Sequence, residues 1–119
     1  MKKTSAVLLV LLFLAGCSEQ ASIEDAVREN LRDPESANFR DSVVSKGGSR
    51  ACVEWNSKNG FGGYGEWDVA RLNKINGKWA ISQMQVSSAD VHSCTKKSLD
   101  LAESTEASVK RILEMSKNM

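Results

Sequence analysis

Three cysteines and one histidine are the most reactive side chains of this sequence. His92 lies two residues before Cys94, a spacing at which an imidazole could activate a thiol for nucleophilic attack. Neighbouring strands could also bring Glu54 close to Glu66 or Asp68 as a carboxylate pair. A single histidine is too few for a typical zinc site, and the glycine-rich segment lacks the Lys-Ser/Thr of a phosphate-binding loop. We therefore predict no catalytic set, no metal and no cofactor.

The first 16 residues have the pattern of a secretory signal peptide. Lys2 and Lys3 precede an apolar run, AVLLVLLFLA, at residues 6–15. This run is about half of the ~20 apolar residues that a membrane-spanning helix needs, so it is typical of a signal peptide. It ends in Leu14-Ala15-Gly16-Cys17, which resembles the lipobox of bacterial lipoproteins.

The resemblance to the lipobox implies cleavage before Cys17 and a diacylglycerol on its sulfur, with a further acyl chain such as palmitate on the new amino terminus. Several chains anchor a protein more firmly than one, which binds membranes only reversibly. In Gram-negative lipoproteins an aspartate after the cysteine retains the protein in the inner membrane. Because Ser18 stands there, the resemblance favours the periplasmic face of the outer membrane. We predict a signal peptide at 1–16, a lipidated tether at 17–21 and one periplasmic domain at 22–119.

Export would place Cys52 and Cys94 in an oxidising compartment, where cysteine pairs form disulfides. On the chain-entropy account a Cys52–Cys94 bond would contribute roughly 3–4 kcal/mol to stability. The alternative is that one of these two cysteines remains a reactive thiol.

The charge of the chain excludes one class of partner. Cleavage after residue 16 leaves 14 basic against 15 acidic residues, and no long run of one sign is present. A nucleic-acid surface is therefore not expected. The expected partners are a membrane, through the lipid, and a protein of the cell envelope.

Two helices are predicted at the ends of the domain. Apolar residues at helical spacing predict a helix over 22–32, with Ser22 as its cap, and Asp33 caps a short helical turn that begins at Pro34. A second helix is predicted over 98–117, either continuous or broken near Ser104. Its apolar stripe consists of Leu99, Ala102, Val109, Ile112 and Leu113.

Strands are predicted over residues 39–44, 50–56, 66–75 and 78–86. Asn76-Gly77 is typical of a two-residue hairpin turn, which would place Leu72 opposite Ile81 and Val69 opposite Met84. The predicted fold is α+β: a four-stranded antiparallel meander sheet flanked by an N-terminal and a C-terminal helix, with one disulfide. We also expect Asp33 to pair with Arg40 at the entry to the sheet.

Two segments carry a recognisable pattern. Residues 33–40 read DPESANFR, and residues 52–64 read CVEWNSKNGFGGY. They resemble a group of small bacterial and phage-associated proteins, many of them lipoproteins, with the pattern D-P-x-S-A-x-F-R and then C-G-x-[VY]-N-x-K-N-x-[FY]-G-G-Y. Val53 stands where that group usually has glycine. The resemblance covers about a third of the chain and implies a family without implying a function.

The glycine-rich segment of this pattern is a candidate interaction loop. Aromatic side chains dominate the energetics of protein interfaces, so a loop that presents aromatics and a cation would bind a protein partner. The alternative is a connection in which the aromatics fold back over Trp55 or Trp67. The candidate residues are Asn56, Lys58, Asn59, Phe61 and Tyr64.

These observations predict a non-enzymatic protein-interaction module on the cell envelope, such as an inhibitor of a hydrolase or a blocker of a surface receptor. The second hypothesis is a structural envelope component without a dedicated ligand. The third is a small thiol or carboxylate enzyme that uses Cys94, His92 or Glu54.

Overall fold

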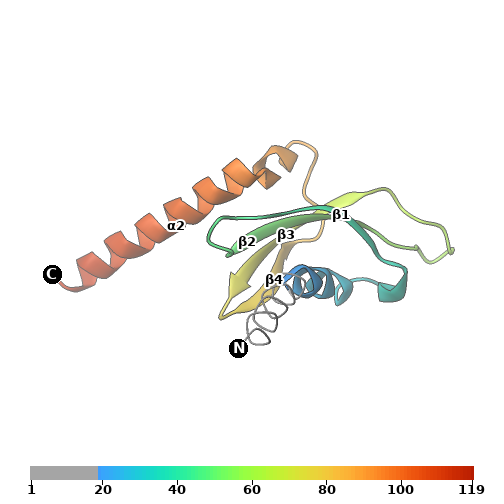
Figure 1. Ribbon diagram of the computed structural model, residues 1–119, viewed down its shortest axis with the longest axis horizontal. Helices are drawn as coiled ribbons and strands as arrows, with labels where there is room; N and C mark the ends of the chain where they lie inside the picture. Colours follow the sequence, from blue (N-terminus) through green and yellow to red (C-terminus); the bar gives the residue numbers. More distant parts are fainter. Residues whose placement is uncertain (1–18) are drawn as a thin grey trace, which may run out of the picture.

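The structure is a computed structural model that describes residues 19–119. Cys17, and with it the predicted signal peptide and lipidation, lies outside these residues. The described chain forms a helix, a four-stranded antiparallel sheet in the order β1-β2-β3-β4, and a long second helix (Figure 1). The predicted α+β meander sheet with two helices is confirmed.

The N-terminal helix covers one face of the sheet and is helical over residues 19–28. Ile23 and Val27 are fully buried on it and belong to the hydrophobic core. The helix includes residues 19–21, which the sequence assigned to a tether, so the predicted cap at Ser22 is wrong. Glu19 explains this early turn, because its carboxylate binds Lys74 Nζ of the sheet at 2.9 Å.

The same helix ends at residue 28, four residues before the predicted end. Asn30 stops it: its amide bonds to the carbonyl of Val27 at 3.0 Å, and its side chain donates to the carbonyl of Ala26 at 3.0 Å. These bonds take up carbonyls that a further helical turn would need. The predicted short turn follows as η1 (Pro34–Ser36), although the Asp33 side chain makes no capping bond.

Four strands make up the sheet. They are β1 (Asn38–Val44), β2 (Arg50–Asn56), β3 (Asp68–Ile75) and β4 (Lys78–Gln83). The predicted bounds of β2 are confirmed. Its Ala51, Val53 and Trp55 belong to the same hydrophobic core as the N-terminal helix, as expected for alternate residues on one face of a strand. β3 and β4 are shorter than predicted, since residues 66–67 and 84–86 lie outside them.

The β3–β4 hairpin has the predicted turn and an unpredicted bulge. Asn76 and Gly77 both have positive φ, 51° and 77°, as a type I′ turn requires. Leu72 pairs with Ile81 as predicted, but the register shifts by one residue directly beyond this pair. The predicted pairing of Val69 with Met84 is therefore wrong.

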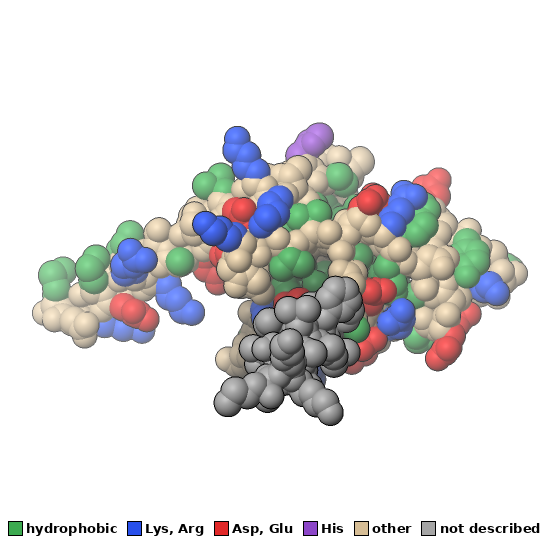
Figure 2. Space-filling view, in the orientation of Figure 1, with side chains coloured by type: hydrophobic (Ala, Val, Ile, Leu, Met, Phe, Trp, Pro, Cys, Tyr) green, Lys and Arg blue, Asp and Glu red, His purple; other side chains and the backbone are tan. Residues whose placement is uncertain are grey.

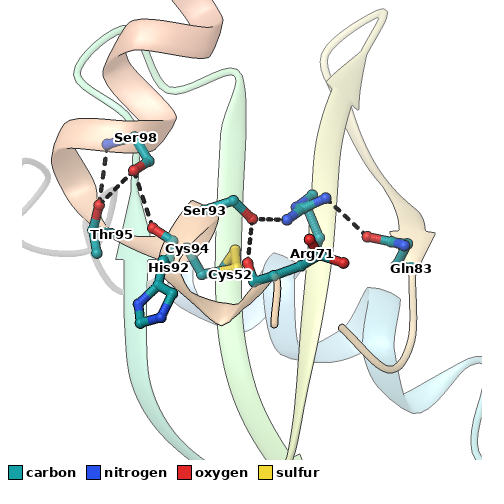
Figure 3. Close-up of a disulfide and its surroundings, with 9 residues drawn as sticks. Cys52, Arg71, Gln83, His92, Ser93, Cys94, Thr95 and Ser98 are labelled. Carbon is teal, nitrogen blue, oxygen red and sulfur yellow. Dashed lines mark hydrogen bonds between the residues drawn. A yellow bond between two sulfur atoms is a disulfide. The ribbon is translucent and has the colours of Figure 1, made fainter. Parts of the chain in front are cut away.

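The second face of the sheet carries the disulfide (Figure 3). Cys52 lies between Ala51 and Val53 on β2, both buried on the helix side, so its side chain points to the opposite face. There it bonds to Cys94, with 5.7 Å between the two Cα atoms. The predicted disulfide is confirmed, and neither cysteine is a free thiol.

Cys94 ends η2 (Val91–Cys94), and α2 (Lys96–Lys117) follows directly. Thr95 caps α2, because its side chain accepts a hydrogen bond from the amide of Ser98 at 3.1 Å. The helix therefore begins two residues earlier than predicted and runs through Ser104 without a break.

α2 is held to the sheet by polar contacts rather than by its apolar stripe. The Glu103 carboxylate accepts from the hydroxyls of Ser45 and Ser49 at 2.5 Å and from the amide of Gly47 at 2.6 Å. The amide of Lys46 donates to Asp100 at 2.6 Å. Of the predicted stripe only Leu99 is buried, and α2 extends past the end of the sheet (Figure 1).

Candidate functional site

The connection between β2 and β3, residues 57–67, forms an ordered glycine-rich loop. Lys58 and Tyr64 form an isolated antiparallel bridge across it. The Asn59 side chain accepts from the amides of Phe61 at 2.9 Å and Gly63 at 3.2 Å. The Asn59 amide also donates to the Gly63 carbonyl at 2.8 Å. Asn59 therefore shapes the tip of the loop through the backbone, and Gly62 supplies the positive φ of 80° that the tip requires.

Aromatic side chains of this loop face solvent. Phe61, at the tip, is 100% exposed, and Tyr64 is 50% exposed. Phe61 therefore does not fold back over Trp55 or Trp67, which was the alternative that the sequence left open. The Lys58 ammonium lies 5.9 Å from the centroid of the Tyr64 ring, so a cation accompanies the aromatics.

Trp67 and Arg40 extend the exposed surface, and the sequence analysis missed both. Trp67 is 37% exposed, and the Arg40 guanidinium lies 3.9 Å from the ring centroid. Arg40 also binds Glu54 at 2.6 Å across β1 and β2, so the predicted pairing of Arg40 with Asp33 is wrong. The register of β1 and β2 shifts by one residue between Arg40 and Val43, so counting pairs outward from the turn would have placed Arg40 opposite Trp55 rather than Glu54.

One predicted loop residue does not belong to the exposed surface. Asn56 is the last residue of β2 and is only 8% exposed. Its side-chain oxygen accepts from Asn38 Nδ2 at 3.1 Å, which closes the end of the β1–β2 pair. Asn56 is therefore a structural residue at the base of the loop. The exposed residues that remain as the candidate surface are Lys58, Phe61, Tyr64, Trp67 and Arg40, and we call this set the loop surface.

The loop surface lies at the end of the sheet opposite the start of the described chain. The turns β1–β2 and β3–β4 share one end, where the Lys74 amide bonds to the Ser49 carbonyl at 2.7 Å and where Glu19 binds Lys74. The β2–β3 connection must lie at the other end, because the strands are antiparallel. With strands of seven or eight residues, about 25 Å separates the two ends.

The arrangement around the disulfide does not form a cysteine–histidine dyad. The sulfur of Cys94 is bonded to Cys52, and the His92 side chain lies on the exposed surface (Figure 3). The backbone carbonyl of His92 accepts from Ser98 Oγ at 3.0 Å. Arg71 binds Ser93 and donates to Gln83 at 2.8 Å, which fixes η2 on the sheet. These contacts position the start of α2.

Glu54 and Asp68 do not form the carboxylate pair that the sequence allowed. Glu54 pairs with Val69 across β2 and β3, whereas Trp55 pairs with Asp68. Glu54 and Asp68 therefore point to opposite faces of the sheet. Glu54 is occupied by Arg40, and Asp68 accepts from Gln85 at 3.2 Å.

Within residues 19–119 no group of three or more His, Cys, Asp or Glu side chains could hold a metal ion. None of the described helices is both long enough and apolar enough to span a bilayer. No family model, curated protein or solved structure matches the chain.

Proposed function

We propose that this chain is a lipid-anchored protein of the cell envelope whose loop surface binds a protein partner without catalysing a reaction. The observation that carries the proposal is the full exposure of Phe61 at the tip of a loop that hydrogen bonds hold in shape. Large aromatic side chains are usually at least half-buried in a soluble domain, and burying one in a partner is a strong source of binding energy.

The order of the loop supports this proposal. A loop that is already shaped loses less conformational entropy on binding than a disordered one. Asn59 bonds two backbone amides of the tip, and the Lys58 amide donates to Ser36 Oγ at 2.9 Å, which ties the base of the loop to η1. The aromatic rings are thus presented on a fixed frame.

The side chains of the loop surface indicate the chemistry of the partner. Phe61 offers an apolar anchor, while Lys58 and Arg40 place cations beside Tyr64 and Trp67. We expect a partner with an apolar pocket that receives Phe61 and acidic or carbonyl groups near its rim. An inhibitor of an envelope hydrolase and a blocker of a surface receptor both fit this description.

The position of the loop surface agrees with anchoring at Cys17. Glu19, two residues after Cys17, binds Lys74 at one end of the sheet, and the loop lies at the other end. A membrane held at Cys17 would leave the loop about 25 Å away and free to meet a partner. The predicted address is the periplasmic face of the outer membrane.

Site-specific photocrosslinking in intact envelopes tests the proposal. A photoreactive residue would replace Phe61 in the full-length chain, and a matched probe would replace Lys78, which is exposed at the opposite end of the sheet. We expect one dominant adduct from position 61 that is absent from position 78. The double substitution F61A/Y64A should reduce recovery of that partner at least tenfold while the melting temperature stays unchanged.

Two results would overturn the proposal. Equal and diffuse adducts from positions 61 and 78 would favour a structural envelope component without a dedicated ligand. Undiminished capture of the partner by the folded F61A/Y64A protein would show that the loop surface is not the binding site.

A further inference from the structure

The chain contains two Asn-Gly pairs, Asn59-Gly60 in the glycine-rich loop and Asn76-Gly77 in the β3–β4 turn. A glycine after asparagine leaves its peptide nitrogen open to approach, because glycine has no side chain. That nitrogen can attack the side-chain carbonyl of the asparagine and expel ammonia. All four residues are exposed, and the glycine-rich loop projects into solvent at the right-hand end of the molecule (Figure 2). The two pairs differ only in what surrounds them.

The side chain of Asn59 lies in a frame of hydrogen-bond donors. Its Oδ1 accepts from the amide of Phe61 at 2.9 Å and from that of Gly63 at 3.2 Å. Attack at Cγ turns this oxygen into an oxyanion, and backbone amides that already point at such an oxygen lower the barrier to acyl transfer. The frame is itself fixed, because the Asn59 amide donates to the Gly63 carbonyl at 2.8 Å and the Gly62 amide donates to the Asn59 carbonyl at 3.1 Å.

A cation lies against the residue that supplies the attacking nitrogen. A Cβ at Gly60 would lie 2.9 Å from Arg32 Nη1, so the guanidinium contacts Gly60. Within residues 19–119 no acid forms an ion pair with Arg32. The nitrogen must lose its proton to attack, and an unneutralised positive charge nearby favours the deprotonated form. Arg32, Asn59 and Gly60 also line one cleft of about 400 Å³, which admits water.

The second pair has neither feature. In the described part of the chain the Asn76 side chain takes part in no hydrogen bond. Apart from the adjoining residues, nothing lies within 4 Å of a Cβ placed on Gly77. Strand pairing on both sides also holds Asn76 at a φ of 51°. Asn76-Gly77 is therefore an internal reference with the same two residue types and the same exposure.

We propose that Asn59 is a self-modifying site whose conversion the folded loop accelerates. The Gly60 nitrogen forms a bond to Asn59 Cγ, and its proton passes through water to the side-chain nitrogen. The bond from Cγ to that nitrogen then breaks, which releases ammonia and leaves a succinimide. Water opens the succinimide at either carbonyl and leaves aspartate or isoaspartate at position 59.

This conversion changes the loop in charge and in shape. Both products add a negative charge beside Lys58. The isoaspartate route also moves Oδ1 into the main chain, so the tip loses the side-chain acceptor for the amides of Phe61 and Gly63. An effect on partner binding rests on the function proposed above, whereas the chemical step does not.

Peptide mapping by mass spectrometry tests the proposal. The full-length chain would be incubated at neutral pH, either folded or in guanidinium chloride, and the peptides that contain positions 59 and 76 would be followed with time. Loss of the mass of ammonia reports the succinimide, and chromatography separates the aspartate and isoaspartate products. We expect position 59 to convert about tenfold faster than position 76 in the folded chain. In guanidinium chloride the two rates should agree within about threefold, because neither pair then keeps its surroundings.

A pair of charge-removing variants provides the matched control. Arg32→Gln should slow conversion at position 59 about threefold, as expected for one exposed unit charge, and leave position 76 unchanged. Lys97→Gln removes the same charge from α2 and should change neither rate. Equal rates at the two positions in the folded chain, or slower conversion at position 59, would overturn the proposal. An unchanged rate in Arg32→Gln would overturn the role of the guanidinium.

Discussion

At the scale of single residues, Asn59 decides whether the loop surface has one shape. Its side-chain oxygen replaces a backbone acceptor for two amides, those of Phe61 and Gly63. This local pattern is the reason that asparagine is common in turns. The residue lies outside the hydrophobic core, so its effect should be confined to the loop.

Asn59→Ala should therefore loosen the loop without unfolding the domain. Each lost hydrogen bond is worth about 0.5–1.5 kcal/mol, and no core contact is removed. We expect the amides of Phe61 and Gly63 to exchange with solvent about tenfold faster, while those of β2 and β3 keep their protection. Asn59→Asp retains the acceptor oxygen and serves as the control. Unchanged exchange at both amides in Asn59→Ala would contradict the structural role of Asn59.

At the scale of elements, Glu103 is the main link between α2 and the sheet. Hydrogen bonds from the Ser45 and Ser49 side chains, together with the amides of Gly47 and Ser49, lower the pKa of Glu103 from 4.5 to about 2, against a smaller opposing effect of burial. The charged form is thus the one that the β1–β2 turn binds. Because the pKa is lower in the folded state, this contribution to stability is complete above pH 4.5 and is lost as the pH falls toward 2.

Glu103→Gln should accordingly flatten the acid limb of the stability curve. Between pH 5 and pH 2.5 the melting temperature of the wild-type protein should fall further than that of the variant, so that the difference between them narrows with acid. Thermal unfolding followed by circular dichroism at a series of pH values measures this. Glu114→Gln, on the solvent side of α2, should follow the wild-type curve. Parallel curves for wild type and Glu103→Gln would contradict the link.

At the scale of the whole molecule, the sequence predicts the order of elements better than their contacts. β2 and the Asn76-Gly77 turn follow from alternation and from local backbone preference, which are properties of short segments. The bulge next to Leu72 and the burial of Asn56 against Asn38 depend on neighbouring strands, so no local pattern reveals them.

The same limit applies to α2 and to the loop surface. An apolar stripe shows that a helix has an apolar face, but not whether the same chain covers that face. The motif around Lys58 likewise predicts a loop, but it does not show that Trp67 and Arg40 belong to the same exposed surface. Arg40 is a residue of β1 and contacts Trp67 only in the folded sheet.

The disulfide connects the two parts of the molecule that these observations distinguish, the compact sheet and the outlying helix. Cys52–Cys94 closes a loop of 42 residues, which on the chain-entropy account is worth about 4 kcal/mol. The double substitution C52A/C94A should therefore lower the melting temperature by more than 10 °C, because each kcal/mol corresponds to roughly 4–8 °C in a domain of this size. Calorimetry of the wild type in reductant should reproduce that loss.

Loss of the disulfide should also make the chain after η2 more accessible to protease, so we expect limited proteolysis there to accelerate in C52A/C94A. Glu103, Asp100 and Arg50 still connect α2 to the sheet in that variant, so adding Glu103→Gln should accelerate proteolysis further. Equal proteolysis of wild type and C52A/C94A would mean that the polar contacts alone hold α2 in place.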